Sequence, residues 1–478
     1  MSGLLRRIRR VHFVGIGGIG MCGIAEVLRD LGCQVSGSDV SKGPTVTRLR
    51  ELGIEVSTGH DASHVGDADV VVVSSAIRAG NPEVREAERL HVPVIPRAEM
   101  LAEIMRVKEG IAVAGTHGKT TTTSLVAHVL TEAGLDPTAV IGGRVRGSTG
   151  DPERAHETGT SGSSGARLGR GELMVAEADE SDGSFLRLAP ILAVVTNIEP
   201  EHLDHWGSEE ALHDGFADFA NKVPFFGAAI LCLDDPGVQQ MLPRLTRRAI
   251  TYGFSVQAEW VASEPRPHGN GMRFEVRWHG ETLGEVTLPL PGRHNVQNAL
   301  AALAVAREAG VSFEASAAAL EAFGGVERRF ESLGTAAGVR VVDDYAHHPT
   351  EIRATLAAAR SLHSGRIVAV FQPHRFSRTR DLFDEFATAF HDADRVWVTE
   401  IYAAGEDKIP GVEAATLVDR LRARGHRGVH LAPDLTDLAA RLAAEVADGD
   451  LVLTLGAGSI TRLGPELLRA LGGAEGSR

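Results

Sequence analysis

The residues best suited to chemistry are the ten at positions 115–124, GTHGKTTTTS, which follow an apolar strand-like run and open a helix-like one. In such a loop, backbone N–H groups and the helix start hold phosphates, a lysine neutralises their charge, and a hydroxyl coordinates Mg²⁺. The complete phosphate-loop pattern has a glycine five residues before its Gly–Lys pair, but this chain has Val113 there. The sequence therefore predicts a shortened ATP-binding loop of Gly115, Thr116, His117, Gly118, Lys119, Thr120 and Thr121.

A second glycine-rich loop, GIGGIG at 15–20, ends a β-rich run and opens another helix-like segment. This spacing permits a tight turn and a close approach of the backbone to a diphosphate, while an acidic residue, Asp39, ends the next strand. Both NAD and a UDP-sugar carry a diphosphate, and glycines that only allow close strand–helix packing are a further alternative. The diphosphate prediction rests on Gly15, Gly17, Gly18, Gly20 and Asp39.

Polar groups also follow two strands of the middle region. VAEADESD (175–182) places Glu177 at a strand end, and TNIEPEHLDHWGS (196–208) places His202 after the neighbouring strand. Ligands bind at the carboxyl ends of parallel strands, so both side chains can face the phosphates. In GRHNVQNALAA (292–302), Asn295 and Asn298 lie one helical turn apart and can present amides to an adenine, although helix capping is an alternative.

The C-terminal third holds a further group of charged and aromatic residues. Arg375 and Arg378 lie at a helix start, where the helix dipole disfavours cations, so an anionic partner such as an amino-acid carboxylate is indicated. ERRFE (327–331) and VVDDYAHHPTEI resemble motifs of the Mur ligase family that bridge ATP to the C-terminal domain. This resemblance implies that Arg329, or its neighbour Arg328, clamps a γ-phosphate and that Asp344 binds near the nucleotide. The pair His347–His348 leaves a metal site open as an alternative.

Strand-like and helix-like runs alternate through most of the 478 residues, which predicts an α/β fold. We expect three domains: residues 1–107, Rossmann-like; 108–322, a phosphate-loop domain with a small antiparallel hairpin at 271–292; and 323–478, Rossmann-like again. The Gly/Ser-rich segment 150–171 is predicted to be a flexible surface loop.

Composition excludes several classes of protein. A net charge of −14 argues against a nucleic-acid binder, with the basic run at 6–10 read as a solvated flank. No apolar run approaches membrane-spanning length and no signal peptide is evident, so no membrane association is expected. Three cysteines without a CxxC pair suit buried thiols in a reducing cytoplasm.

These motifs together resemble the Mur ligase family over nearly the whole chain. The resemblance implies an ATP-dependent ligase with two Mg²⁺ ions, and it makes Thr120, Glu177 and His202 metal ligands. The segment VHFVGIGGIGMCGIAEVL, with SSAI at 74–77, is similar to the alanine-adding branch of the family, which implies UDP-N-acetylmuramate at the first glycine loop and adds Ser74 and Ser75 there. Phe216 occupies the usual position of a carbamylated lysine, which this branch also lacks.

The same resemblance implies that Tyr345, His347, Arg375 and Arg378 surround L-alanine, and that Lys119, Arg329, Asp344 and His347 serve catalysis. The implied reaction joins L-alanine to the lactyl carboxylate of UDP-N-acetylmuramate through an acyl phosphate, as a first peptide-forming step of peptidoglycan precursor synthesis. Domain closure would assemble the site, and a monomer or weak homodimer is expected. A nicotinamide-dependent oxidoreductase would leave the phosphate loop unused, and an ATP-driven switch would leave the C-terminal arginines unused.

Overall fold

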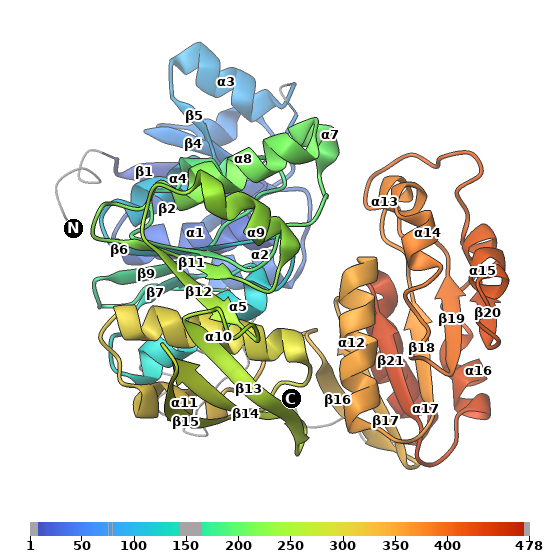
Figure 1. The fold of residues 1–478 in the computed structure, drawn as a ribbon. Helices are drawn as coiled ribbons and strands as arrows, with labels where there is room; N and C mark the ends of the chain where they lie inside the picture. The colour runs from blue at the N-terminus through green and yellow to red at the C-terminus, as the bar shows by residue number, and fades with distance from the viewer. Residues whose placement is uncertain (1–7, 75, 79, 144–164, 473–478) are drawn as a thin grey trace. The chain divides into compact units, whose positions relative to one another are not determined.

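The computed structural model describes residues 8–74, 76–78, 80–143 and 165–472 and has a three-domain α/β architecture with one sheet per domain (Figure 1). The chain divides into two compact units. The first comprises Met1–Glu264, Phe274–Val286 and Gln297–Gly324, and the second comprises Pro265–Arg273, Thr287–Val296 and Gly325–Arg478. The three-domain fold predicted from the sequence is confirmed; the boundaries 1–107, 108–322 and 323–478 remain a prediction.

The N-terminal sheet has the strand order β3-β2-β1-β4-β5, and all its pairings are parallel. Val11 and Phe13 pack on one face in the main core, while Val14 and Val71 pack with Ala87 on the other, as the two-residue side-chain period of a strand requires. The elements are β1 Arg10–Val14, α1 Ile19–Asp30, β2 Gln34–Asp39, α2 Pro44–Glu51, β3 Glu55–Thr58, η2 Ala62–Val65, β4 Val70–Val73, α3 Pro82–Leu90, β5 Val94–Pro96 and α4 Arg97–Met105.

The central sheet has ten strands in the order β15-β14-β13-β12-β11-β10-β6-β9-β7-β8. Its parallel strands include β6 Glu109–Ala114, β7 Thr138–Val140, β9 Leu173–Glu177, β10 Leu192–Val195, β11 Ala228–Cys232, β12 Ala249–Gly253 and β13 Trp260–His268. The predicted hairpin is present as β14 Gly271–Trp278 and β15 Glu281–Leu288, whose two-residue connection requires antiparallel strands. The helical segments are α5 Lys119–Glu132, η3 Ser184–Arg187, α7 Leu203–Trp206, α8 Glu209–Ala220, α9 Pro236–Met241, η4 Leu242–Arg244, α10 Arg293–Glu308 and α11 Phe313–Glu321.

The predicted surface loop at 150–171 needs a correction at one end. Residues 150–164 lie outside the described part of the chain, but Ala166–Arg167 form the short strand β8, which pairs antiparallel with β7. Ala166 and Leu168 pack against the large core of the first unit, which explains why this end of a Gly/Ser-rich segment is ordered as a strand.

The C-terminal sheet has the order β16-β17-β21-β18-β19-β20, with β16 antiparallel to β17 and the other pairs parallel. Apolar clusters cover both faces, one formed with α12 and α15 and the other with α16 and α17. The elements are β16 Glu331–Ala336, β17 Val339–Asp344, α12 Pro349–Leu362, β18 Ile367–Phe371, α13 Phe376–Asp381, α14 Phe383–Phe386, β19 Arg395–Thr399, α15 Ala414–Ala423, β20 Val429–Ala432, α16 Leu438–Glu445, β21 Leu451–Leu455, η5 Ser459–Arg462 and α17 Leu463–Ala470.

All three cysteines are free thiols in buried positions, as expected from the sequence. Burial raises the pKa of Cys33, and it raises the pKa of Cys232 in β11 to about 12, so both stay protonated at neutral pH. Among the described residues, no helix has both the length and the apolar character needed to cross a bilayer.

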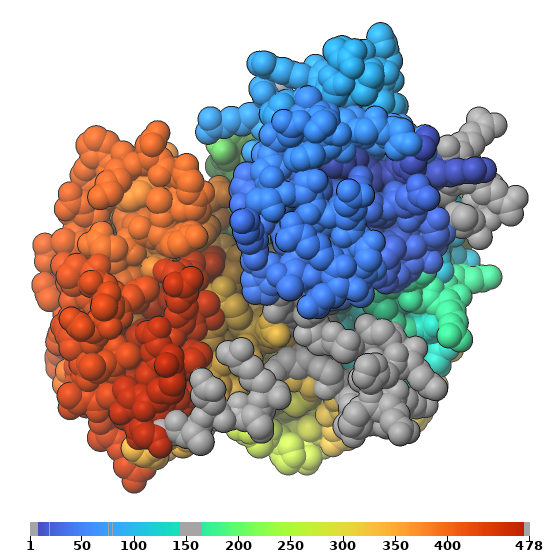
Figure 2. All heavy atoms as spheres, turned by 180° about the vertical axis from the view of Figure 1, so that it is seen from behind, coloured from blue at the N-terminus to red at the C-terminus, as the bar shows by residue number. Residues whose placement is uncertain are grey.

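A network of polar side chains on the N-terminal sheet is organised around one buried carboxylate. Glu83 Oε2, in α3, lies 2.8 Å from His12 Nε2 and accepts a hydrogen bond from Ser38 Oγ at 2.8 Å. Its other oxygen lies 3.1 Å from His60 Nδ1 and accepts the Asp61 backbone N–H at 3.2 Å. The helix that carries this carboxylate lies at one extremity of the first unit (Figures 1 and 2).

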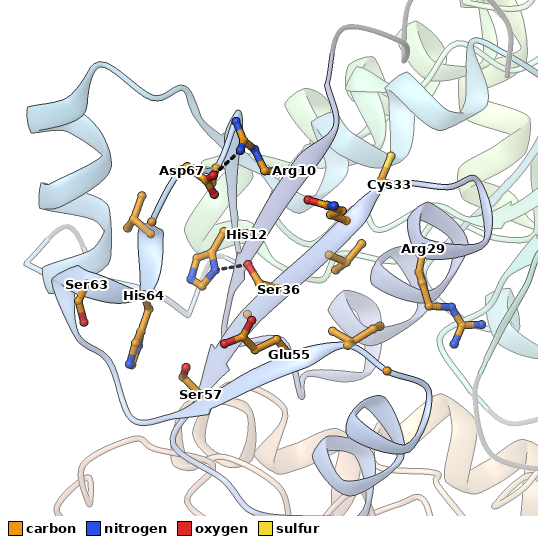
Figure 3. A pocket seen from close by; sticks show the side chains of 18 residues that line it. Arg10, His12, Arg29, Cys33, Ser36, Glu55, Ser57, Ser63, His64 and Asp67 are labelled. Atoms are coloured by element: carbon orange, nitrogen blue, oxygen red, sulfur yellow. Dashed lines mark hydrogen bonds and ion pairs between the residues drawn. The ribbon is translucent and has the colours of Figure 1, made fainter.

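A groove of about 650 Å³ opens beside this network (Figure 3). His12 and Ser36 line it from β1 and β2, with 2.9 Å between His12 Nδ1 and Ser36 Oγ, and Arg10 and Asp67 form an ion pair at its rim. None of the residues predicted to bind a ligand lines this groove.

Glu83 should link the stability of the N-terminal sheet to acid pH. Burial acts to raise the pKa of Glu83, but the hydrogen bonds from His12 and Ser38 outweigh it and lower the pKa from 4.5 to about 2. The stabilisation, about 3 kcal/mol, is therefore present above pH 4.5 and lost as the pH falls toward 2. We expect Glu83→Gln to remove it, so that unfolding free energies of wild type and variant, measured in denaturant from pH 6 to 2, converge at low pH.

The matched control is Glu86→Gln on the same helix, because Glu86 pairs with Arg89 at the surface. This variant should keep the acid sensitivity of the wild type. A constant stability difference between wild type and Glu83→Gln across the pH range would contradict the assignment.

Candidate active site

The first glycine loop connects β1 to α1 at the carboxyl edge of the N-terminal sheet. Gly15 has φ +79°, a conformation that favours glycine, and Gly18 is the N-cap of α1. A side chain at Gly17 would place its Cβ 2.8 Å from Asp39 Oδ2, so the loop and the acidic residue are in direct contact. Gly20 lies in the first turn of α1.

Asp39 braces this loop. Its Oδ2 accepts the Gly17 backbone N–H at 2.8 Å, and its Oδ1 accepts the Ser41 N–H at 2.7 Å. Ser74 follows β4, and Ile77, whose N–H donates to the Ser74 carbonyl, reaches 3.4 Å from where a Cβ at Gly15 would be. The predicted residues for the sugar nucleotide therefore gather at one sheet edge, except Ser75, which lies outside the described residues.

The second glycine loop connects β6 to α5 and has the strand–loop–helix form of a phosphate loop. Gly115 (φ +135°) and Gly118 (φ +80°) adopt backbone conformations that favour glycine, and Gly118 is the N-cap of α5. Thr121 is buried in the first turn of that helix. Backbone donors at a helix start and a lysine in the same loop are the requirements of a triphosphate site.

Lys119 is a buried cation held by oxygen atoms. Its Nζ donates to the carbonyls of Gly115 at 2.6 Å and Thr116 at 3.0 Å, and lies 2.8 Å from Glu180 Oε2. Burial opposes the charge on Lys119, but the carboxylates of Glu180, Glu177 and Asp179 together outweigh it and raise the lysine pKa. Burial raises the pKa of Glu180 to about 7, with the Lys119 charge acting in the opposite direction. The ammonium thus keeps its charge inside the protein.

Thr120 and Glu177 form an oxygen pair beside the loop. Thr120 Oγ1 donates to Glu177 Oε1 at 3.0 Å, and the other carboxylate oxygen accepts the Gly142 N–H at 2.7 Å. A hydroxyl and a carboxylate are oxygen ligands of the kind Mg²⁺ prefers, so these two residues fit the ion. His202 caps the short helix α7 with φ +57°, and its Nε2 lies 3.7 Å from Glu201.

The loop following β10 supports the phosphate loop through residues that were not assigned from the sequence. Asn197 accepts the His117 N–H at 2.8 Å and donates to the His117 carbonyl at 3.0 Å, while the Glu199 N–H donates to Thr116 Oγ1 at 2.9 Å. Asn197 and Glu199 both lie in TNIEPEH. Their position directly after a strand is the feature of the sequence that could have identified them. Glu180 was visible in EADESD as one carboxylate among several, without a partner that distinguished it.

Asn295 and Asn298 are both buried on α10, and the structure separates their contacts. The Asn295 amide donates to the Pro291 carbonyl at 2.7 Å. Asn298 lies against the phosphate loop, since a Cβ at Gly118 would be 2.9 Å from its Oδ1. Its contact with Gly118 therefore places Asn298 beside the predicted nucleotide site.

In the second unit, the two arginines of ERRFE have different surroundings. Both guanidiniums lie over the Tyr345 ring, at 4.9 Å for Arg328 and 5.2 Å for Arg329, but Arg328 is also held by Asp343, with 3.0 Å between its Nε and the carboxylate. Asp344 accepts the N–H groups of Phe330 at 2.7 Å and Ala346 at 2.8 Å. Burial raises the pKa of Asp344 to about 6, against the charge of Arg329. Of the two arginines, Arg329 is better placed to meet a ligand.

Aromatic rings join the next two predicted segments. Tyr345 and His347 follow β17, and the His347 ring contacts His374, which follows β18, at 5.8 Å between centres. His374 stacks on Tyr402, and burial, with the charges around it, lowers its pKa to about 4. Arg375 and Arg378 follow directly, at the start of α13. His374 was not assigned from the sequence, although it precedes Arg375 in FQPHRFS.

The alternative of a metal held by the His-His pair gains no support within the second unit. His347 Nδ1 lies 3.1 Å from the Tyr345 carbonyl, and His348 caps α12 by accepting the Thr350 N–H. Phe216, at the position of the family lysine, is fully buried against Phe185 and Phe219. It therefore serves packing, and it has no ionisable group to modify.

Comparison with known proteins agrees with this geometry. Models described as the Mur ligase family catalytic domain, middle domain and glutamate ligase domain match residues 10–109, 113–306 and 328–458. The chain is 56% identical over 471 residues to the UDP-N-acetylmuramate–L-alanine ligase of Anaeromyxobacter sp. (strain Fw109-5), which covers 98% of this chain and 100% of that protein.

Two solved structures are also similar. The UDP-N-acetylmuramate–alanine ligase of Thermotoga maritima is 30% identical with a TM-score of 0.79, covering 96% of this chain and 98% of that one. A murein peptide ligase of Psychrobacter arcticus is 27% identical with a TM-score of 0.70, covering 98% and 99%. Because the family models together span most of the sequence, and a relative of 56% identity covers nearly all of it, the chain belongs to the Mur ligase family.

Proposed function

We propose that this chain is an ATP-dependent ligase that joins L-alanine to the lactyl carboxylate of UDP-N-acetylmuramate and releases ADP and phosphate. This is a first peptide-forming step in peptidoglycan precursor synthesis. The observation that carries the proposal is the phosphate loop. It holds the buried cation of Lys119, paired with Glu180, and next to it in the sequence Thr120, whose Oγ1 lies 3.0 Å from Glu177 Oε1. The names of the relatives supply the acyl donor, UDP-N-acetylmuramate, and the amino acid that accepts the acyl group, L-alanine.

Each of the three substrates has its own group of binding residues. The first glycine loop binds the diphosphate of the UDP-sugar, and the second loop, with Asn298 beside it, binds ATP. Tyr345, His347, Arg375 and Arg378 bind L-alanine, whose carboxylate suits a guanidinium. The domains 1–107, 108–322 and 323–478 would then carry the sugar nucleotide, ATP and amino-acid sites in turn, with Asn295 also near the adenine.

Thr120 and Glu177 would hold Mg²⁺, and His202 would hold a second ion. Bound Mg²⁺ neutralises charge on the transferred phosphoryl group and orients it. The 3.0 Å contact between Thr120 Oγ1 and Glu177 Oε1 supports this role, because it brings together two oxygen atoms of the kind Mg²⁺ prefers.

Chemistry proceeds in two displacements. A lactyl carboxylate oxygen attacks the γ-phosphorus of ATP, and the bond to ADP breaks, leaving an acyl phosphate. Lys119 and Arg329 stabilise the charge on the phosphoryl oxygens, which is the main contribution a protein makes to such a transfer. The neutral amine of L-alanine then attacks the acyl carbon, phosphate leaves, and the amine loses a proton.

One assay separates this function from the alternatives. Phosphate release from ATP should require both UDP-N-acetylmuramate and L-alanine. Release without them would indicate an ATP-driven switch, and an absorbance change with NAD would indicate an oxidoreductase. Faster turnover with a tripeptide than with alanine would indicate a recycling ligase. We place the reaction in the cytoplasm and expect a monomer or weak homodimer that binds neither nucleic acid nor membrane.

Replacing the loop lysine should abolish turnover. Because Lys119 is the buried cation of the phosphate loop, Lys119→Ala should lower kcat by about 10³-fold or more. Calorimetry should show unchanged binding of UDP-N-acetylmuramate at the other loop. Lys222→Ala is the control, since Lys222 follows α8 and contacts the Leu186 carbonyl; it should keep normal turnover, and normal turnover of Lys119→Ala would refute the assignment.

Removing Arg378 should weaken the amino-acid site selectively. We expect Arg378→Ala to raise the KM for L-alanine by about 30- to 100-fold, the loss typical of a guanidinium–carboxylate contact, with little change in the KM for ATP. Arg380→Ala is the matched control on the same helix, because Arg380 pairs with its neighbour Asp381 at the surface. An equal rise in both KM values for Arg378→Ala would show that Arg378 maintains the fold instead.

A further inference from the structure

An arginine outside the predicted sites lies directly on the first glycine loop. Arg97 is the first residue of α4, and it packs over Gly20 in the first turn of α1. A Cβ at Gly20 would lie 2.7 Å from Arg97 Nη1 and 3.1 Å from Cζ. Gly20 does not have a positive φ, so its lack of a side chain serves to admit the guanidinium.

The opposite side of the same guanidinium faces the nucleotide site. Arg97 Nη2 lies 3.5 Å from Asp179 Oδ2, a long separation for an ion pair, and the arginine side chain is 24% exposed. Asp179 precedes Glu180, the partner of Lys119. Arg97 therefore pairs with Asp179 while Lys119 pairs with the adjacent Glu180, so two neighbouring carboxylates each hold one cation.

The surroundings of Arg97 favour an anionic ligand. A cation at the first position of a helix is opposed by the helix dipole. Among the described residues, the carboxylate paired with Arg97 is that of Asp179, which faces Nη2 at 3.5 Å, so the guanidinium has further N–H donors to offer a second anion. The diphosphate has its own donors in the loop backbone and the start of α1. Arg97 covers Gly20 and faces Asp179, whose neighbour Glu180 pairs with Lys119, so its guanidinium is turned toward the proposed ATP site.

We propose that Arg97 binds the lactyl carboxylate of UDP-N-acetylmuramate and positions it between the first glycine loop and the phosphate loop. The inference rests on the proposed function, since it needs that sugar nucleotide as substrate. The planar fork of Arg97 would bind the carboxylate in bidentate fashion, with Gly20 providing the space. Asp179 holds the guanidinium in place before the substrate arrives. Arg97 therefore selects a sugar nucleotide that carries a carboxylate over one that does not.

The test compares two sugar nucleotides by calorimetry on the full chain. UDP-N-acetylmuramate has both the diphosphate and the carboxylate, and UDP-N-acetylglucosamine has the diphosphate alone. We expect Arg97→Met to weaken binding of the first by about 10- to 100-fold and of the second by less than about threefold. Arg97→Lys should recover only part of the loss, because an ammonium lacks the fork.

Two further variants separate ligand contact from structure. Gly20→Ala keeps the arginine and suits a helix, but its methyl group would displace the guanidinium, so it should lose the same selectivity. Arg187→Met is the matched control, because Arg187 pairs at 3.0 Å with Glu99, which is also on α4. It should bind both sugar nucleotides as the wild type does, and Mg-ADP binding should be unchanged in every variant.

Each result bears on a definite claim. Equal losses for both sugar nucleotides in Arg97→Met would assign Arg97 to the diphosphate or to loop structure and overturn the inference. Wild-type affinity of Arg97→Met for UDP-N-acetylmuramate would overturn it as well, while leaving the proposed ligase intact. Failure of the wild type to bind UDP-N-acetylmuramate would overturn both.

Discussion

A lysine that must stay charged while buried is the constraint on which the nucleotide site depends. Lys119 keeps its proton because Glu180 and two loop carbonyls surround it. That arrangement needs the positive φ angles of Gly115 and Gly118, and it needs β6 and β9 side by side so that their ends meet. Removing Glu180 would leave an unpaired ammonium in the protein interior, which is far more costly than losing an exposed ion pair. In the proposed function, the phosphates of ATP would therefore enter a site whose cation is already in place.

The same topological rule positions every candidate group. In a parallel sheet the carboxyl ends of neighbouring strands share one edge, and ligands bind there. The N-terminal sheet presents its glycine loop, Asp39 and Ser74 in this way. The central sheet does so with the phosphate loop, Glu177 and Asn197, and the C-terminal sheet with Tyr345 and His374, which flank β21. Three sheets of similar construction would thus provide the three ligand sites of the proposed function through their loops.

Much of this could be predicted from the sequence, because glycine loops and strand ends are local patterns. Gly17 and Asp39, or Thr120 and Glu177, were expected at the same edge and are in contact. Side-chain partners were harder to predict. Nothing in EADESD distinguishes Glu180 from its neighbours until the fold brings Lys119 to it, and Arg97 is 77 residues from the glycine that it covers. Order at Ala166–Arg167 was missed because composition suggested a loop, while pairing with β7 and burial against the core determine the structure.

The burial of all three cysteine thiols has a practical consequence. Cys22, Cys33 and Cys232 are each no more than 6% exposed, and the two with raised pKa values are poorly nucleophilic. Maleimide reagents should therefore leave the folded chain unmodified. A single cysteine introduced on the surface of each compact unit would then accept a fluorophore or spin label at a defined position. The separation of the two units could be followed during turnover without replacing any native residue of the interior.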